Sequence, residues 1–238
     1  MRNNVLRYYF NRNDNDLDLK LKYPLPENIE CHTIEVTRTA RWFNIGAAVS
    51  DCDEIVIILH GYGQHPSFML SGIRDLEKPR RSICAPEGLS RFYVRGSSGR
   101  VGASWMTRDV RDQEINDHIS YLNTWLQSLN LKRKTHITLI GFSQGVATAA
   151  RWMASGIEID RVIFLSGTLP PEWKDEKPKI NSRIDEIHIV RPSQDEYYSK
   201  TEHNKSLELL KYCGSMIKSH EPEGTHKINV ALLMQLLS

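Results

Sequence analysis

The chain has 238 residues, of which 40% are hydrophobic and 25% are charged, and its 31 basic and 29 acidic residues leave a formal net charge of +2. This composition is ordinary for a soluble globular protein, and the length suits one α/β domain with a substantial core. The nearly balanced charge gives no reason to expect nucleic acid or an anionic membrane as a partner.

The four cysteines are far apart and form no Cys-x-x-Cys pair, so they are expected to be reduced thiols rather than disulfide or metal ligands. Residues 1–7 lack the apolar run of a signal peptide, and no stretch approaches the roughly 18 apolar residues of a membrane span. We therefore expect a cytoplasmic protein without a metal or other cofactor, as a monomer or a small oligomer such as a homodimer.

The first fifty residues have the pattern of antiparallel strands. Apolar and β-branched residues recur between short turn-forming breaks, which predicts strands at 5–10, 17–21, 31–37 and 40–45. After them, residues 54–59 form a continuous apolar run, as expected of a central strand that is covered on both faces. The chain thus divides into N-terminal strands over 1–50 and a core over 54–238, both within a single domain of 1–238.

Beyond residue 54, predicted strands alternate with predicted helices. The strands are 54–59, 81–85, 135–140, 161–165, 187–190 and 216–219, and the helices are 67–76, 109–129, 146–155, 202–212 and 227–237. Such alternation predicts a mostly parallel central sheet with helices on both faces, extended at one edge by the antiparallel N-terminal strands.

The segment Gly141-Phe142-Ser143-Gln144-Gly145 lies between an apolar strand and an alanine-rich helix. A serine on so sharp a strand-to-helix turn adopts a strained backbone conformation, and the flanking glycines avoid collisions with neighbouring backbone. This placement raises the serine hydroxyl at the carboxyl edge of the sheet. The pattern predicts Ser143 as a nucleophile.

A nucleophilic serine needs a histidine as base and a carboxylate to orient that histidine. Asp195 follows the strand at 187–190 and is the best candidate for the carboxylate, with Glu196 beside it and Asp185 at the wrong end of the strand. His226 lies in a turn-rich loop before the last helix and is the best candidate for the base, with His220 as its main competitor. The order serine, acid, histidine is the one that this arrangement of strands requires.

The reaction also needs two donors for the oxyanion that forms on the attacked carbonyl. The backbone N–H of Gln144, at the start of a helix, is one candidate. The other is the N–H of Tyr62, since His60-Gly61-Tyr62-Gly63-Gln64 directly follows the strand at 54–59 and its glycines let backbone approach a substrate. Two histidines there, His60 and His65, lack further ligands for a metal.

Six motifs occur in a fixed order over residues 54–238: Leu59-His60-Gly61-Tyr62-Gly63, Ala85-Pro86-Glu87-Gly88, Gly102-Ala103-Ser104-Trp105, Gly141-Phe142-Ser143-Gln144-Gly145, Leu165-Ser166-Gly167 and Gly224-Thr225-His226. Together they resemble the phospholipase/carboxylesterase family of α/β-hydrolases, which includes acyl-protein thioesterases and bacterial carboxylesterases. The resemblance implies an α/β-hydrolase fold with 54–238 as the catalytic core.

By this resemblance, Ser143, Asp195 and His226 are the catalytic triad, and the amides of Tyr62 and Gln144 form the oxyanion hole. The implied function is a serine hydrolase that cleaves small carboxylic esters through an acyl-enzyme on Ser143. The alternatives are an acyl-protein or acyl-thioester thioesterase, a lysophospholipase, and a ligand-binding homologue without turnover.

The substrate pocket is expected to include Trp105 and Met106, which stand where the family usually has Trp-Phe-Asp. Residues 170–183 form a polar connection that is either a solvated loop or a partial lid, with Trp173 on the acyl side. Residues 96–102 are expected to be a flexible loop at the rim of the pocket. No large apolar cap interrupts the strands, which favours short or medium acyl chains.

Overall fold

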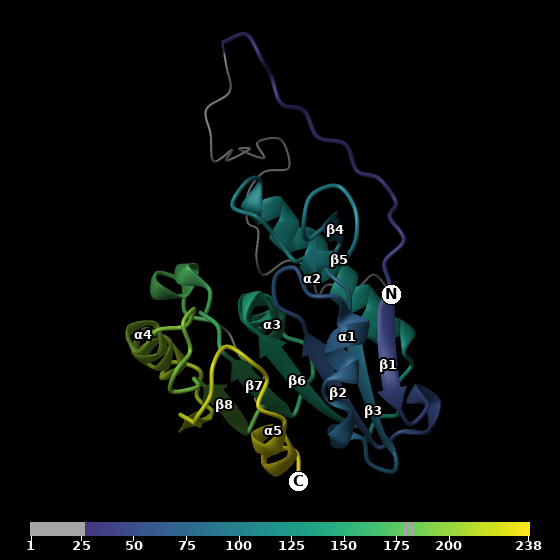
Figure 1. Cartoon of the computed structure of the whole chain (residues 1–238), viewed down its shortest axis with the longest axis vertical. Coiled ribbons are helices and arrows are strands. Elements are labelled where there is room, and N and C mark those ends of the chain that lie inside the picture. The colour runs from purple at the N-terminus through teal and green to yellow at the C-terminus, as the bar shows by residue number, and fades with distance from the viewer. Residues whose placement is uncertain (1–26, 179, 181–182) are drawn as a thin grey trace.

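The computed structural model describes residues 27–178, 180 and 183–238 (Figure 1). The strands are β1 (Trp42–Gly46), β2 (Glu54–Leu59), β3 (Arg81–Pro86), β4 (Ser90–Tyr93), β5 (Val101–Ser104), β6 (His136–Phe142), β7 (Arg161–Leu165), β8 (Glu186–Val190) and β9 (Met216–His220). The α-helices are α1 (Pro66–Ser71), α2 (Arg111–Ser128), α3 (Gln144–Ala154), α4 (Lys200–Leu210) and α5 (Val230–Leu236), and the 3-10 helices are η1 (Val49–Asp51), η2 (Arg74–Leu76) and η3 (Pro171–Lys174).

Seven strands form one twisted sheet in the order β1-β3-β2-β6-β7-β8-β9. From β3 to β9 all neighbouring strands are parallel, whereas β1 runs antiparallel to β3 at one edge. Strands β4 and β5 form a separate antiparallel hairpin. The predicted fold class, a mostly parallel α/β sheet with an antiparallel N-terminal edge, is confirmed.

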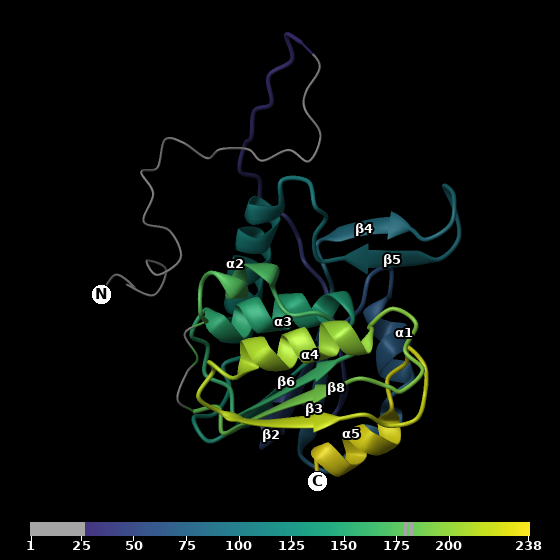
Figure 2. The same ribbon diagram turned by 90° about the vertical axis from the view of Figure 1, so that its left-hand side faces the viewer.

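The apolar run in β2 is continuous because both faces of the sheet are covered. On one face Ile55, Ile57 and Leu59 pack into a core with α2, α3 and α4, and on the other Val56 and Ile58 pack with α1 and α5. Figure 2 shows α2, α3 and α4 on one side of the sheet and α5 on the other. Burial on both faces supplies the main driving force for this architecture.

Five strands of the sheet that run parallel to one another have their carboxyl ends on the same side, namely β2, β6, β7, β8 and β9. We call this side the carboxyl edge of the sheet. The loops that leave these ends carry the residues for which the sequence predicts chemistry. Open parallel sheets generally bind their ligands at this edge.

Two differences from the predicted strands concern the N-terminal part. The predicted strand at 31–37 is wrong: these residues are exposed and belong to no strand, because β-branched residues favour a strand only where a partner supplies hydrogen bonds. The predicted strand at 40–45 is present as β1. The predicted strands at 5–10 and 17–21 lie outside the described residues.

Three further differences concern where an element begins or ends. The predicted helix at 67–76 ends early, since Gly72 caps α1 and the short η2 follows. The last helix begins at Val230 rather than 227, because the Asn229 side chain accepts a hydrogen bond from the Leu232 amide and caps it there. Residues 96–102 are not all loop: Val101 and Gly102 belong to β5, and the rest connect it to β4.

Candidate active site

Ser143 lies on a tight turn between β6 and α3. Its φ of 52° and ψ of −120° are unfavourable for any residue with a Cβ. A Cβ at Gly145 would lie 2.2 Å from the Leu59 carbonyl oxygen, and one at Gly141 would lie 2.7 Å from the Gly145 carbonyl oxygen. The turn is further fixed by a 2.9 Å hydrogen bond from the Ser143 amide to the Leu165 carbonyl. Only glycine fits at positions 141 and 145, two residues before and two residues after this strained serine.

Three side chains from three different loops form a hydrogen-bonded chain at this point. His226 Nε2 lies 2.9 Å from Ser143 Oγ, and His226 Nδ1 lies 2.9 and 3.0 Å from the two carboxylate oxygens of Asp195. A carboxylate only accepts hydrogen bonds, so Nδ1 carries a proton and neutral Nε2 accepts from the serine hydroxyl. The geometry suits transfer of the hydroxyl proton to the imidazole.

Asp195 is held as an anion by its surroundings. Its side chain is fully buried, which raises its pKa, but the amides of Tyr198 and Tyr197 donate hydrogen bonds of 2.9 and 3.0 Å to Oδ1. These bonds and the one from His226 outweigh burial, so the pKa of Asp195 lies below its ordinary value. The carboxylate is therefore charged at neutral pH and can stabilise an imidazolium.

The other candidates for the acid and the base lie elsewhere or have other partners. Asp185 precedes β8, whereas Asp195 follows it. Glu196 accepts a hydrogen bond of 3.4 Å from the backbone amide of His226 rather than from its ring. His220 ends β9, and its Nε2 lies 3.0 Å from His188 Nδ1. Of the candidates, only Asp195 and His226 are hydrogen-bonded in line with Ser143.

The loop after β2 faces the same point. A Cβ at Gly61 would lie 3.1 Å from Ser143 Cβ, which shows how closely the loop approaches the serine. The Gly61 amide donates to Gln64 Oε1 at 2.7 Å, and the Gly63 amide donates to the Ala103 carbonyl at 2.9 Å. Over residues 27–178, 180 and 183–238, no protein acceptor takes a hydrogen bond from the amides of Tyr62 or Gln144. Both donors remain available for a ligand.

His60 supports this loop from below. It is fully buried, and burial lowers its pKa to about 4, so the ring is neutral. Nε2 accepts a hydrogen bond from the Gly88 amide at 3.0 Å, which leaves the proton on Nδ1 to be donated to the Gly61 carbonyl at 2.8 Å. The Trp105 indole N–H donates to the His60 carbonyl at 2.8 Å. His60 thus has a positioning role and is not available as a metal ligand.

A comparison with protein families matches most of the chain to one family. The model of the family described as phospholipase/carboxylesterase matches residues 42–238. This chain belongs to the phospholipase/carboxylesterase family. No curated protein sequence matches it significantly.

Several solved structures with a similar fold have names that describe them as esterases or thioesterases. Esterase PE8 superposes with a TM-score of 0.66 at 19% identity, over 84% of this chain and 98% of the other. A carboxylesterase from Mesorhizobium loti gives 0.63 at 18% identity, over 83% and 94%. Acyl-protein thioesterase 2 from Zea mays gives 0.61 at 16% identity, over 84% and 100%. At these identities the likeness establishes the α/β-hydrolase fold of this family member.

The aromatic residues expected in the substrate pocket are not exposed. Trp105 is fully buried and stacks on His60 with ring centroids 4.9 Å apart, and Trp173 is only 4% exposed within the same hydrophobic core. Met106 is half-buried and packs against the same core. Both tryptophan side chains are thus buried in the core, and their role in a substrate pocket stays a prediction.

The side chain of Gln144 was not predicted to have a role, but it joins the serine turn to the segment after β5. Its Oε1 accepts from the Trp105 amide at 3.1 Å, and its Nε2 donates to the Met106 carbonyl at 2.8 Å. Ser104 Oγ contacts both ends of the same amide. A long amide directly after the nucleophile was the only signal in the sequence. These bonds fix the turn that carries the Gln144 N–H.

Within the predicted loop or lid at 170–183, the described 3-10 helix η3 is anchored by charge. Glu172 in η3 forms hydrogen-bonded ion pairs of 2.7 Å with Arg151 Nε and with Arg111 Nη2. Burial raises the pKa of Glu172, but the two arginines outweigh it and lower the pKa to about 2. The helix η3 is tied to α3 and to the start of α2 through Glu172.

Two kinds of site are absent from the described residues. No group of three or more His, Cys, Asp or Glu side chains in the described ranges is arranged to hold a metal ion. None of the helices found there has both the length and the hydrophobicity needed to cross a membrane.

Proposed function

We propose that this protein is a carboxylesterase-type serine hydrolase that cleaves esters with short to medium acyl chains. The observation that carries the proposal is the continuous hydrogen-bonded chain from Asp195 through His226 to Ser143, beside the Tyr62 and Gln144 amides, which have no acceptor among the described residues. Family membership supports the same reaction class.

The first half of the reaction follows from the geometry. Ser143 Oγ attacks the ester carbonyl carbon while His226 Nε2 takes the hydroxyl proton. The carbonyl oxygen becomes an oxyanion, which accepts hydrogen bonds from the Tyr62 and Gln144 amides. When the tetrahedral intermediate collapses, His226 returns the proton to the leaving alcohol and the acyl group stays on Ser143.

The second half repeats these roles with water. His226 Nε2 removes a proton from a water molecule, whose oxygen attacks the acyl-serine carbonyl carbon. The second oxyanion occupies the same two amides, and Ser143 Oγ leaves with the proton that His226 returns. The Asp195 carboxylate stabilises the imidazolium in both halves and keeps the proton on Nδ1.

Covalent labelling tests this proposal. A fluorophosphonate probe should attach to wild-type protein through Ser143, as peptide mass spectrometry would show, and should not attach to Ser143→Ala. Ser120, an exposed serine on α2 outside the site, provides the control: Ser120→Ala should still be labelled. Absence of labelling in correctly folded wild-type protein would refute the proposal and favour a binding protein without turnover.

A further inference from the structure

The segment from Leu89 to Arg108 concentrates positive charge. It contains Arg91, Arg95, Arg100 and Arg108 and no aspartate or glutamate, in a chain whose net charge is only +2. Most of this segment is the β4–β5 hairpin, which projects from the body of the protein in Figure 2. An unbalanced basic element of this kind attracts anions.

The hairpin is attached to the loop that carries the Tyr62 amide. The Ala103 amide donates to the Gln64 carbonyl at 3.0 Å, and the Gly63 amide donates back to the Ala103 carbonyl at 2.9 Å. The rings of Tyr62 and Phe92 contact each other with centroids 5.2 Å apart. Any ester whose carbonyl reaches the Tyr62 amide therefore lies next to the hairpin.

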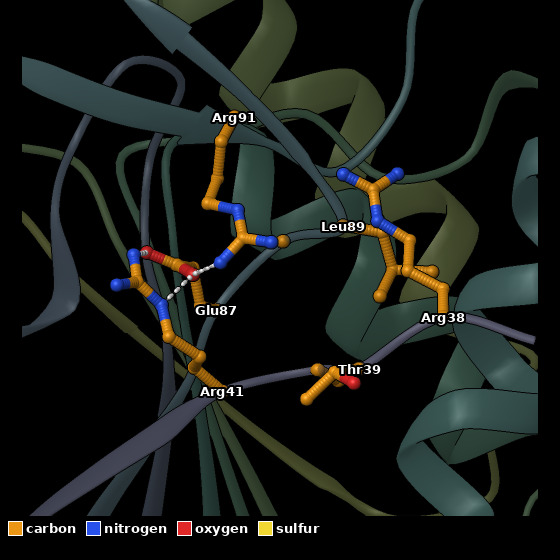
Figure 3. Close-up of a pocket in the computed structure, with 8 residues that line it drawn as sticks. Arg38, Thr39, Arg41, Glu87, Leu89 and Arg91 are labelled. Carbon is orange, nitrogen blue, oxygen red and sulfur yellow. Dashed lines mark hydrogen bonds and ion pairs between the residues drawn. The ribbon is translucent and has the colours of Figure 1, made fainter.

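The base of the hairpin is anchored by a buried carboxylate. Glu87 is 2% exposed, and its Oε2 lies 3.5 Å from Arg91 Nη1 and 2.8 Å from Arg41 Nε. Figure 3 shows Arg41 and Arg91 converging on Glu87 from two sides, while Arg38 points away from it. Arg91 is thus occupied in holding the hairpin in place and contributes less to a ligand.

The two arginines nearer the tip are differently placed. Arg95 and Arg100 are exposed, and within the described ranges neither has a carboxylate at ion-pairing distance. Arg100 pairs with Val94 across the hairpin, since the Val94 amide donates to its carbonyl at 2.9 Å. The Arg100 guanidinium lies 5.6 Å from the ring centroid of Phe68, which is 63% exposed on α1. This contact places the Arg100 guanidinium beside α1, the helix that follows the loop carrying the Tyr62 amide.

We propose that Arg95 and Arg100 form a subsite for an anionic group on the substrate, a carboxylate or a phosphate, beyond the scissile ester. This inference rests on the proposed function. Guanidinium groups recognise both anions through paired N–H donors. Arg95 is three residues beyond Phe92 and two beyond the end of β4, a reach of at most about 10 Å of chain, so the anion would be several bonds away from the carbonyl. The preferred substrates are then anionic esters rather than neutral ones.

Matched ester pairs test the subsite. One pair puts the charge on the acyl side, with 4-nitrophenyl butyrate against the 4-nitrophenyl monoester of glutaric acid. The other puts it on the alcohol side, with 1-butyrylglycerol against its 3-phosphate. At low ionic strength the anionic member of at least one pair should have a kcat/KM about fivefold to tenfold higher, as two partly screened charges would produce, and 0.5 M NaCl should remove most of the preference.

Charge variants identify the arginines. In the double variant Arg95→Gln/Arg100→Gln, the ratio of kcat/KM for the anionic to the neutral ester should fall to about one. The matched control Arg133→Gln/Lys134→Gln removes two exposed cations before β6, at the opposite edge of the sheet, and should keep the wild-type ratio. The control separates a local subsite from the effect of net charge.

Each other outcome has a distinct meaning. Equal kcat/KM values within both pairs, or a preference that survives in Arg95→Gln/Arg100→Gln, would overturn the subsite while leaving the hydrolase intact. A preference seen only when the esters are presented in anionic lipid vesicles, and not with monomeric esters, would replace the subsite by docking to a lipid surface. Hydrolysis of none of the four esters would instead refute the proposed function, and the subsite with it.

Discussion

Both carboxylate oxygens of Asp195 lie within 3.0 Å of His226 Nδ1, although the two residues are 31 positions apart in the chain. The neighbouring Glu196 reaches only the His226 backbone amide. The two adjacent carboxylates therefore differ sharply in what they can do for the imidazole ring.

Replacing Asp195 by Asn should lower kcat for 4-nitrophenyl butyrate by about 10⁴-fold. The amide can donate a hydrogen bond to Nδ1, which favours the tautomer with its proton on Nε2 and removes the base. Steady-state kinetics checks this. Glu196→Gln is the control and should stay within a few-fold of wild type; the reverse pattern would assign the acid to Glu196.

Gly102→Ala should lower kcat/KM by about 10²-fold. A Cβ at position 102 would lie 2.1 Å from the Gly63 carbonyl oxygen and so displace the loop that presents the Tyr62 amide. Gly72→Ala is the matched control, since its Cβ would meet only ordinary contacts of 3.5 Å or more. Thermal unfolding of both variants separates a displaced loop from a loss of folding. Normal activity of folded Gly102→Ala would contradict the role of this loop.

Ser143→Gly should be more stable than Ser143→Ala by about 1 kcal/mol. Both variants lack the hydroxyl, but only glycine adopts a φ of 52° with a ψ of −120° without steric cost. Urea unfolding of the two inactive variants measures the difference. An alanine variant as stable as the glycine variant would show that the turn carries no strain.

Glu172 should contribute to stability in a pH-dependent way. Its pKa in the folded protein, about 2, is lower than its ordinary value of 4.5. A depressed carboxyl pKa adds stability that is fully present above the unfolded value and is lost as the pH falls toward the folded value. The difference in unfolding free energy between wild type and Glu172→Gln should therefore be constant from pH 7 to about 5 and shrink between pH 5 and 2.

Urea unfolding at pH 7, 5 and 3 measures this difference. Glu208→Gln provides the control, because Glu208 and Lys211, the C-cap of α4, form an exposed ion pair that should contribute little at any of these pH values. A gap between wild type and Glu172→Gln that stays unchanged at pH 3 would show that the contacts of Glu172 with Arg151 and Arg111 do not depend on its charge.

Much of the fold could be predicted because hydrophobic burial dictates it. The run at 54–59 and the amphipathic pattern at 109–129 correspond to β2 and α2. A strand covered on both faces leaves a continuous apolar run, and a helix covered on one face leaves a helical periodicity. The strand predicted at 31–37 is absent, because β propensity alone does not supply a neighbouring strand to pair with. The sequence does not predict the β4–β5 hairpin. Half-buried and exposed residues alternate along β4, but the nearby arginines and glycines obscure this pattern in the sequence.

The candidate active site likewise has features that the sequence predicts and features that it does not. The glycines around Ser143 predict the turn, because the backbone collisions that they avoid arise within a five-residue segment. Its approach to His226 and Asp195 was expected from strand order, which places their loops at one edge. The positions of Trp105 and Trp173 and the bonds of Gln144 depend on packing between distant segments, which no local pattern encodes.

The most direct test of the account is the turnover number of Ser143→Ala for 4-nitrophenyl butyrate. If the Ser143 hydroxyl attacks the ester with His226 as its base, kcat should fall by about 10⁶-fold relative to wild type, as expected where the three side chains act as one unit. If folded Ser143→Ala hydrolyses the ester within tenfold of the wild-type rate, Ser143 is not the nucleophile and the proposed mechanism is wrong.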